Sequence, residues 1–389
     1  INMSAKRPTQ TASAVWREVN ALARRPGAIN MGQGFPDVPG SRVARAAAAA
    51  ALLDDVDPLG LNQYAPPNGL FELRSALASF YKRQYNATSY DPDGEIVVCT
   101  SGQEALVASL RACIAASGRR GVALFEPFYP FALGAIVAAG GVPRVARLRP
   151  PAFEIDDALL AAPPFHSSSV NGCNDDADEI GVVLANSPHN PTGRVSRRDE
   201  LDKLAALCRD RDLFAVSDEV YEHAVFRDGA EHLRLADAVG MKHRTCTVGS
   251  AGKLLSLTGW RVGWVLASNR DLAARVAETR THLTYSAPTP LQVGVAAALR
   301  DVDSLDAAFA DVRDLYGGNY LLLADALEKA GLDVCPAQGG YFLVARTPDG
   351  IPDLDFVHRL ADDAGVVCTP LSVFYGKDAF SANKSDDDD

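Results

Sequence analysis

One lysine of the chain lies among residues that suit covalent chemistry on a carbonyl group. Lys253 follows Gly252, and Gly249 and Ser250 lie just upstream. Such small residues allow the backbone to approach a ligand closely. An amine that is partly removed from water has a lowered pKa, so it can attack a carbonyl carbon. The stretch therefore indicates Schiff-base chemistry at Lys253.

Two other interpretations of this stretch compete with that one. A phosphate-binding P-loop needs Gly, four intervening residues and then Gly-Lys-Ser or Gly-Lys-Thr. Gly249 lies only three positions before Gly252, and Leu254 stands where Ser or Thr is required, so the spacing excludes a P-loop. The other alternative is an exposed surface lysine, which is the commoner role for a single Gly-Lys pair. Only the remaining motifs can decide against it.

Composition and charge limit the class of protein. The chain has 389 residues, of which 47% are hydrophobic, and a formal net charge of −11. This length exceeds what one hydrophobic core usually serves, so we expect a globular protein with two lobes. The acidic balance argues against general nucleic-acid binding, and no apolar run reaches the roughly 18 residues that predict a membrane span.

The cysteines and the N-terminus bear on metal binding and location. Seven widely spread cysteines with no Cys-x-x-Cys indicate neither a disulfide framework nor a zinc site, and no metal site is predicted. No secretory signal is visible, so we expect a cytoplasmic protein. Because residue 1 is Ile rather than Met, mitochondrial or plastid targeting upstream of it stays open.

Strands and helices alternate through the middle of the chain. Apolar strands are predicted at residues 95–100, 121–125, 142–148, 180–184 and 213–217. This alternation predicts an α/β fold whose mostly parallel sheet is covered by helices on both faces. In such sheets ligands bind at the carboxyl ends of the strands.

The order of these elements predicts two domains. We expect a large domain over residues 46–286, and a smaller α+β domain that combines residues 1–45 with residues 287–389. The small domain is predicted to contain residues 339–344 as a strand. Residues 163–179 are rich in Ser, Asn, Asp and Gly and predict an exposed insertion, and the chain ends in an acidic tract.

Polar motifs follow the predicted strands, and their order is informative. They are Ser101-Gly-Gln-Glu-Ala105, Glu126-Pro-Phe-Tyr129, Asn186-Ser-Pro-His-Asn-Pro-Thr-Gly193, Ser217-Asp-Glu-Val-Tyr221 and Ser250-Ala-Gly-Lys253, with Arg261 shortly after. In order and spacing these motifs resemble the fold type I pyridoxal-phosphate aminotransferases of class I/II. Asn30-Met-Gly-Gln-Gly-Phe-Pro-Asp37 is similar to their kynurenine, glutamine and methionine subgroup. The resemblance covers about residues 16–375.

The resemblance implies pyridoxal 5′-phosphate (PLP) as cofactor and three catalytic residues. Lys253 corresponds to the lysine that binds the cofactor covalently, and the same amine can move a proton. Asp218 corresponds to the carboxylate that keeps the pyridine nitrogen protonated, although Asp218 alone could also be a helix N-cap. Tyr221 and Asn190 match the pair that hydrogen-bonds the oxygen of the ring.

The remaining cofactor contacts are implied in the same way. Tyr129 matches the aromatic residue stacked on the ring face, and core packing is its alternative role. The cofactor phosphate would be held by a set of five residues, namely Gly102, Gln103, Ser250, Arg261 and Tyr64. Since the last of these would reach over from a second subunit, the resemblance implies a homodimer.

The substrate contacts that the resemblance implies involve fewer residues. Gly34 corresponds to a backbone contact to the α-carboxylate, Trp16 to a pocket wall, and Tyr285 to an aromatic residue from the other subunit. The family also places its main carboxylate-binding arginine in the C-terminal part of the small domain. Here no arginine follows Arg359, which lies in a predicted helix, so we expect a truncated small domain.

The expected activity is PLP-dependent transfer of an amino group from an amino acid to a 2-oxo acid. The subgroup suggests kynurenine, glutamine, methionine or aromatic amino donors. Two alternatives remain open at this point. One is a cysteine-conjugate carbon–sulfur β-lyase on the same cofactor, and the other is a non-catalytic relative or fragment that lacks the carboxylate-binding arginine.

Overall fold

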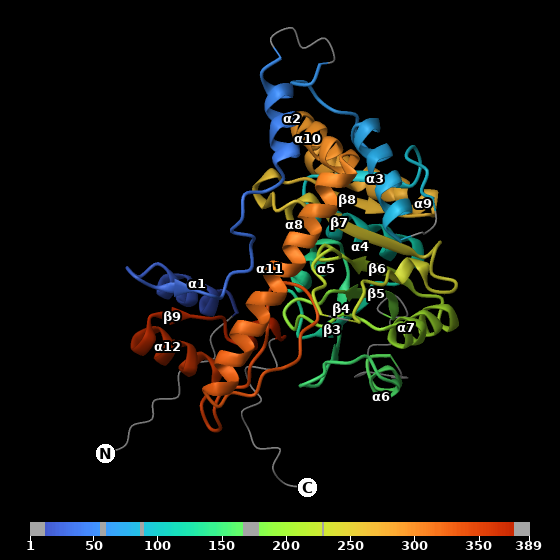
Figure 1. Ribbon diagram of the computed structural model, residues 1–389. Coiled ribbons are helices and arrows are strands. Elements are labelled where there is room, and N and C mark those ends of the chain that lie inside the picture. The colour runs from blue at the N-terminus through green and yellow to red at the C-terminus, as the bar shows by residue number, and fades with distance from the viewer. Residues whose placement is uncertain (1–11, 55–59, 86–88, 166–178, 228, 377–389) are drawn as a thin grey trace.

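A seven-stranded sheet forms the centre of the molecule (Figure 1). The computed structural model describes residues 12–54, 60–85, 89–165, 179–227 and 229–376. The strand order is β2-β8-β7-β6-β5-β3-β4. The strands are β2 (Ile96–Cys99), β3 (Gly121–Glu126), β4 (Val142–Arg147), β5 (Ile180–Asn186), β6 (Phe214–Asp218), β7 (Thr245–Ser250) and β8 (Gly263–Leu266).

Only one strand of this sheet runs against the others. β8 is antiparallel to both of its neighbours, β2 and β7. Every other neighbouring pair is parallel, so the remaining six strands point in one direction. Their carboxyl ends therefore lie along one edge, and the predicted α/β fold with a mostly parallel sheet is confirmed.

Helices cover both faces of the sheet, which explains why the residues of its inner strands are almost all buried. Leu124 packs in the core on one face, whereas its neighbour Phe125 packs in the core on the other. The first face is covered by α4 (Gly102–Ser117), α5 (Ala132–Ala138) and α9 (Arg270–Thr284). The second is covered by α6 (Asp157–Ala161) and α7 (Arg198–Asp210).

A third core lies where β2 and β8 meet a group of helices. The helices are α2 (Arg42–Leu52), α3 (Phe71–Tyr85), α8 (Ala251–Leu254) and α10 (Thr289–Arg300). A Cβ atom built on Gly294 of α10 would lie 2.5 Å from the carbonyl oxygen of Ala44 in α2, so only glycine permits this helix contact. α10 therefore packs closely on α2, and the domain boundary at residue 287 stays a prediction.

The two ends of the described chain combine in a smaller lobe (Figure 1). Its elements are α1 (Ala12–Ala23), β1 (Ile29–Asn30), α12 (Asp353–Ala364), β9 (Val366–Val367) and the short helix η4 (Leu371–Phe374). β1 pairs with β9 in parallel, and Val15, Val19 and Val357 contribute to the core between the helices. The long helix α11 (Val302–Lys329) runs from the sheet toward this lobe.

The predicted strand at residues 339–344 is wrong. Within the described residues this segment makes one isolated bridge, between Val225 and Gly339, and a second bridge joins Val334 to Ala345 just after it. Gly340 adopts a φ of 76°, which interrupts an extended backbone. The remaining short helices are η2 (Leu235–Asp237) and η3 (Thr258–Trp260).

Two features of the sequence have no structural counterpart to describe. Most of the predicted insertion, residues 166–178, and the acidic tract after residue 376 lie outside the described residues. None of the helices in the described ranges combines the length and the apolar character needed to cross a membrane.

Candidate active site

A cavity of about 320 Å³ opens at the carboxyl edge of the sheet. Strand ends and helix N-termini face it, together with residues of the smaller lobe. The predicted site residues that line it are Trp16, Gly34, Gly102, Gln103, Tyr129, Asn190, Asp218, Tyr221, Ser250, Lys253 and Arg261. Segments that are far apart in the chain thus contribute to one cavity.

Lys253 projects from α8 into this cavity and is half-buried. Its Nζ atom donates a hydrogen bond to the carbonyl oxygen of Gly34, at 3.0 Å. It also lies 5.3 Å from the ring centroid of Tyr221 and 5.1 Å from that of Tyr341. Burial lowers the pKa of Lys253 to about 8, and Asp218 partly opposes this shift. The amine can therefore lose its proton near neutral pH and act as a nucleophile.

Asp218 ends β6 and is held by the strand beside it. The Nδ2 atom of Asn186 donates to the Asp218 carbonyl oxygen at 2.9 Å. Burial raises the pKa of the Asp218 carboxyl to about 6, while the backbone N–H of Val220 opposes the rise. The carboxylate is mostly ionised at pH 7 and poorly solvated, so it suits a cationic partner inside the cavity.

Asn190 and Tyr221 form a polar pair on the same wall. The Asn190 Nδ2 atom donates to the Tyr221 hydroxyl at 3.4 Å. Burial raises the pKa of Tyr221, and the nearby Asp218 raises it further, so the phenol stays protonated. The buried Oδ1 atom of Asn190 makes no hydrogen bond within the described chain. Such an atom indicates a missing polar partner, because leaving it unpaired costs free energy.

Hydrogen bonds among neighbouring residues stabilise the turn that contains Asn190. The His189 Nδ1 atom lies 2.8 Å from the Thr192 hydroxyl, and the Gly193 N–H donates to the His189 carbonyl at 2.8 Å. Arg194 forms a buried ion pair with Glu200. Burial lowers the pKa of His189 to about 3, so its ring is neutral.

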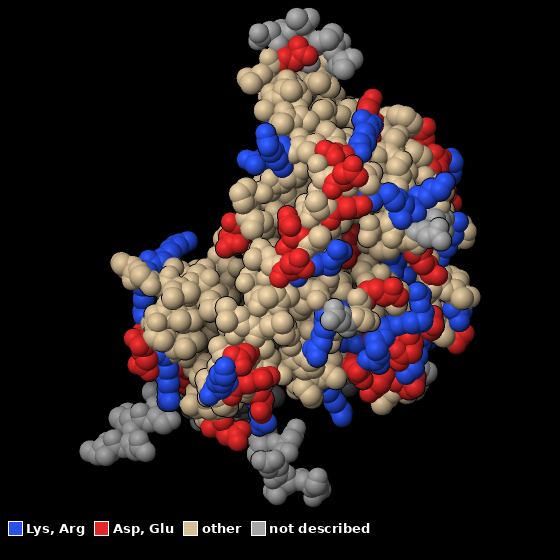
Figure 2. All heavy atoms as spheres, in the orientation of Figure 1, with Lys and Arg blue, Asp and Glu red and all other residues tan. Residues whose placement is uncertain are grey.

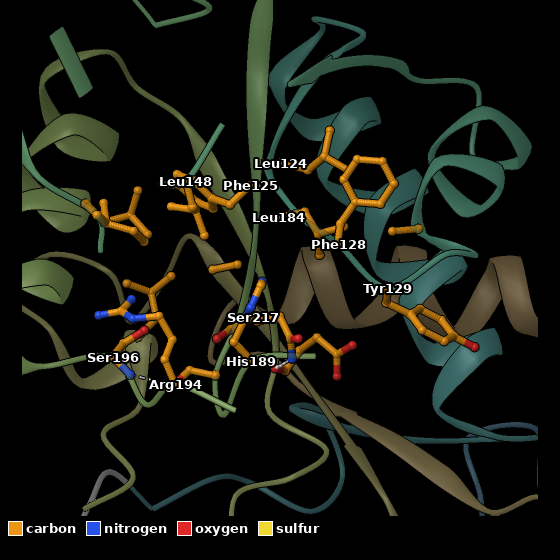
Figure 3. A pocket seen from close by; sticks show the side chains of 18 of the residues that line it. Leu124, Phe125, Phe128, Tyr129, Leu148, Leu184, His189, Arg194, Ser196 and Ser217 are labelled. Carbon is orange, nitrogen blue, oxygen red and sulfur yellow. Dashed lines mark hydrogen bonds between the residues drawn. The ribbon is translucent and has the colours of Figure 1, made fainter. Parts of the chain in front are cut away.

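A narrow apolar cavity separates this turn from the aromatic wall of the site. Figure 3 shows Leu124, Leu184 and Phe128 grouped near Tyr129, with Arg194 and Ser196 on the other side of the cavity. Because the apolar side chains fill the space beneath the site, the strand ends have a packed support. The Tyr129 hydroxyl points away from them in this view.

The N-terminus of α4 provides the anion-binding part of the cavity. Gly102 begins the helix after Ser101, whose Oγ atom accepts from the Glu104 N–H at 3.3 Å. Free N–H groups and the helix dipole at such an end favour a phosphate. Ser250 and Arg261 line the cavity beside it and add a hydroxyl and a guanidinium.

One glycine outside the predicted set allows this arrangement. A Cβ atom on Gly263 would lie 2.4 Å from the carbonyl carbon of Ser101 and 2.6 Å from the nitrogen of Gly102. β8 can thus run directly beneath the helix N-terminus only if position 263 is glycine. Gly263 follows Arg261 closely in the sequence, so the close approach could have been suspected from that stretch.

Aromatic and apolar side chains form the opposite wall. Trp16 packs edge-on against Phe374, with ring centroids 6.1 Å apart. A Cβ atom on Gly34 would clash with Phe342, at 2.0 Å from its Cζ atom. Tyr129 lies 5.4 Å from the ring of Phe131. Phe131, Phe342 and Phe374 line the cavity but were not predicted, because their positions depend on how the lobes pack.

Tyr64 and Tyr285 do not line the cavity of their own chain. Their rings pack edge-on at 5.3 Å and lie at the surface, with exposures of 83% and 47%. The structure therefore places the two predicted residues in contact with each other. Neither of them lines the cavity of its own chain. Arg359 lies exposed on α12 and does not line the cavity either, so among the described residues Lys253 and Arg261 are its only cations.

Comparisons with known proteins agree with this geometry. The family model for aminotransferase class I and II matches residues 26–381. The solved structure of N-succinyldiaminopimelate aminotransferase from Mycobacterium tuberculosis is 34% identical, with a TM-score of 0.82, and the match covers 96% of this chain and 92% of that one. Methionine aminotransferase of Escherichia coli is 31% identical, covering 94% of this chain and 89% of that protein. Kynurenine–oxoglutarate transaminase of Dictyostelium discoideum is also 31% identical, covering 96% and 89%.

The chain therefore belongs to the class I and II aminotransferases, which depend on PLP. The cavity fits that cofactor on its own evidence. It joins an amine with a lowered pKa, an ionised carboxylate, an unpaired amide oxygen and a helix N-terminus beside an arginine. Within the described residues no group of His, Cys, Asp and Glu side chains is arranged to hold a metal ion.

The pKa of Lys253 leads to a first prediction. We expect its reductive methylation by formaldehyde in the cofactor-free protein, followed by mass spectrometry, to rise with pH around a midpoint near 8. In Asp218→Asn the midpoint should fall, because the carboxylate that favours the charged amine is gone. A midpoint near 10.4, the ordinary value for lysine, would contradict the desolvated environment.

The close backbone contact at Gly263 leads to a second prediction. Gly263→Ala must push the N-terminus of α4 away from β8, so we expect PLP to bind roughly 5- to 160-fold more weakly, the range that an overpacking cost of about 1–3 kcal/mol corresponds to. Gly318→Ala is the matched control, since a Cβ atom there meets no atom within 4 Å. Circular dichroism checks that both variants fold. Unchanged PLP affinity in Gly263→Ala would show that the contact is not needed.

Proposed function

We propose that this protein transfers an amino group from an amino acid of the kynurenine, glutamine, methionine or aromatic type to a 2-oxo acid, using PLP. The observation that carries the proposal is the grouping of Lys253, Asp218 and Asn190 in one cavity. The family supports amino-group transfer in general. Relatives named for kynurenine and methionine support the finer substrate class.

The roles proposed for the residues follow from their chemistry. Lys253 binds the cofactor and then moves a proton to and from the α carbon of the substrate, because its amine titrates near neutral pH. Asp218 would hold the proton of the pyridine nitrogen of the bound cofactor, and Tyr221 and Asn190 would hydrogen-bond its ring oxygen. When bound, the cofactor supplies a conjugated ring that withdraws electrons from the substrate.

The phosphate and the ring face have their own contacts in this proposal. The backbone of Gly102 and Gln103 binds the phosphate together with Ser250 and Arg261, and Tyr129 stacks on the ring. Arg261 adopts the left-handed conformation, with a φ of 55°, and its guanidinium also donates to the Thr258 carbonyl at 3.1 Å.

The wall on the substrate side favours an uncharged, bulky amino donor. Trp16, Phe131, Phe342 and Phe374 line the cavity, and once Lys253 and Arg261 serve the cofactor, no other described cation lines it. A second carboxylate on the substrate would therefore be desolvated without a partner, which costs several kcal/mol. Aromatic or thioether side chains would instead bury apolar surface.

A homodimer completes the site in this proposal. Tyr64 and Tyr285 form an exposed aromatic pair, and exposed tyrosines of this kind are typical of interfaces. We propose that Tyr64 reaches the phosphate site of a second copy, and that Tyr285 contacts the substrate there.

The activity is tested by half-reactions on the PLP-loaded protein. Kynurenine, methionine, glutamine and phenylalanine should each shift the cofactor absorbance, whereas aspartate and N-succinyldiaminopimelate should react more slowly. Lys253→Ala should remove the imine absorbance and slow the reaction roughly 10²–10⁴-fold or more, while the exposed Lys329→Ala serves as control. A preference for the acidic donors would overturn the substrate class. Release of pyruvate and ammonia from a cysteine conjugate without an oxo acid would indicate the β-lyase.

The dimer is tested by complementation between two chains that are each impaired in the cofactor site. In a hybrid of Lys253→Ala with Tyr64→Phe, one site combines an intact Lys253 with an intact Tyr64 from the other chain. Tyr64→Phe alone should weaken PLP binding about tenfold or more, in line with a lost hydrogen bond to a charged group. Coexpression should restore one tight PLP site per dimer. No recovery, or a monomeric mass in light scattering, would contradict the shared site.

A further inference from the structure

A second polar cavity lies outside the active site and shares no lining residue with it. It measures about 820 Å³, is open to solvent, and is lined by residues of α3, α7 and α11, of the segment 222–225 and of the segment that contains η2. Figure 1 labels α3, α7 and α11, and Figure 2 shows, in the same orientation, Lys and Arg side chains interspersed with Asp and Glu on the visible face. The proposal below is independent of the amino-group transfer argued above.

Three side chains that line this cavity, His223, His232 and Arg234, contain buried nitrogen atoms that make no hydrogen bond within the described chain. His223 is 8% exposed, and neither of its ring nitrogens has a hydrogen-bond partner within the described chain. His232 likewise leaves Nδ1 unpaired, and Arg234 leaves Nε and Nη1 without hydrogen bonds. Because buried polar groups in native proteins are nearly always satisfied, this grouping indicates a missing polar partner.

The surroundings of these three side chains show why they cannot satisfy one another. The His232 Nε2 atom already pairs with Glu219 at 3.1 Å, and Arg234 Nε lies 3.5 Å from the same carboxylate. Arg234 is buried among the rings of Tyr81, Tyr85 and Tyr90, at 5.1 to 5.4 Å.

The ring of His223 lies against an aromatic side chain. It packs on Phe309 of α11, with centroids 5.4 Å apart. Burial lowers the pKa of His223 to about 3, so the ring is neutral and offers one N–H donor and one acceptor.

The charges around the cavity favour an anion over a metal ion. Arg198, Lys242 and Arg313 line its exposed rim, and the last two make no hydrogen bond or ion pair with the described residues. Of the acids, Glu222 already accepts hydrogen bonds from two tyrosine hydroxyls, and burial raises its pKa. The other two acids of the lining are Glu231 and Asp237. The Asp237 carboxylate lies 3.7 Å from the Nη1 atom of Arg234.

We propose that this cavity binds a small oxyanion ligand, with a phosphate or carboxylate group held between the His223 and His232 rings and the rim residues Arg313 and Lys242. The neutral imidazole can donate to the anion, and the rim cations offset its charge. His223 follows Tyr221 by two residues, so the ligand would contact the segment that faces Lys253 on its other side.

The test is binding of inorganic phosphate and of succinate, each titrated by calorimetry into the PLP-loaded protein, whose cofactor site is already filled. We expect saturable, one-to-one binding of at least one of them, and a change in the ¹⁵N chemical shifts of the His223 ring at the same concentrations. Phosphate alone would identify a phosphate-bearing ligand, and succinate alone a carboxylate.

Variants locate the binding site. Arg313→Gln changes an exposed side chain and should weaken binding at least tenfold without affecting the fold, and His223→Phe should do the same. Arg275→Gln, an exposed arginine of α9 that does not line the cavity, should bind within twofold of the unchanged protein. Absence of saturable binding of either anion, or equal effects of Arg313→Gln and Arg275→Gln, would show a water-filled cavity only and overturn the proposal.

Discussion

The site depends on the register of three parallel strands. Asn186 of β5 pairs with Asp218 of β6, which pairs in turn with Val248 of β7. This register places the turn with Asn190, the carboxylate and the helix with Lys253 side by side at one edge. A shift by one residue would turn the Asp218 side chain to the opposite face of the sheet and displace the turn and the helix that follow the neighbouring strands. The backbone hydrogen bonds between the strands thus determine the spacing of the site residues, independently of their side-chain contacts.

The electrostatics of the cavity follow from that spacing. Burial disfavours the charged form of both groups, lowering the pKa of Lys253 and raising that of Asp218, whereas their mutual attraction opposes both shifts. The desolvation term is the larger for each group. The amine consequently stays reactive instead of being locked in an ion pair, and the carboxylate remains available to a cation.

The sequence predicted the parts that depend on local patterns. The strands before Ser101, Asn186 and Asp218 are apolar runs ended by polar residues, so their carboxyl ends could be expected to converge. The predicted strand at residues 339–344 was wrong, because an apolar run forms a strand only where a neighbouring strand pairs with it. The aromatic wall with Phe342 and Phe374 could not be predicted from the sequence either, because it forms where segments distant in the chain pack against each other.

The segment from Asp218 to His223 connects the two cavities. Asp218 and Tyr221 face the active site, whereas Glu222 and His223 face the second cavity. Glu219 lies between them: it accepts from Ser217 at 2.7 Å, and through Leu235 N–H, His232 and Arg234 it is tied to the outer network. Its negative charge also raises the pKa of Asp218. Any change in how Arg234 and His232 balance Glu219 must therefore alter the field at Asp218, even though the two cavities have no side chain in common.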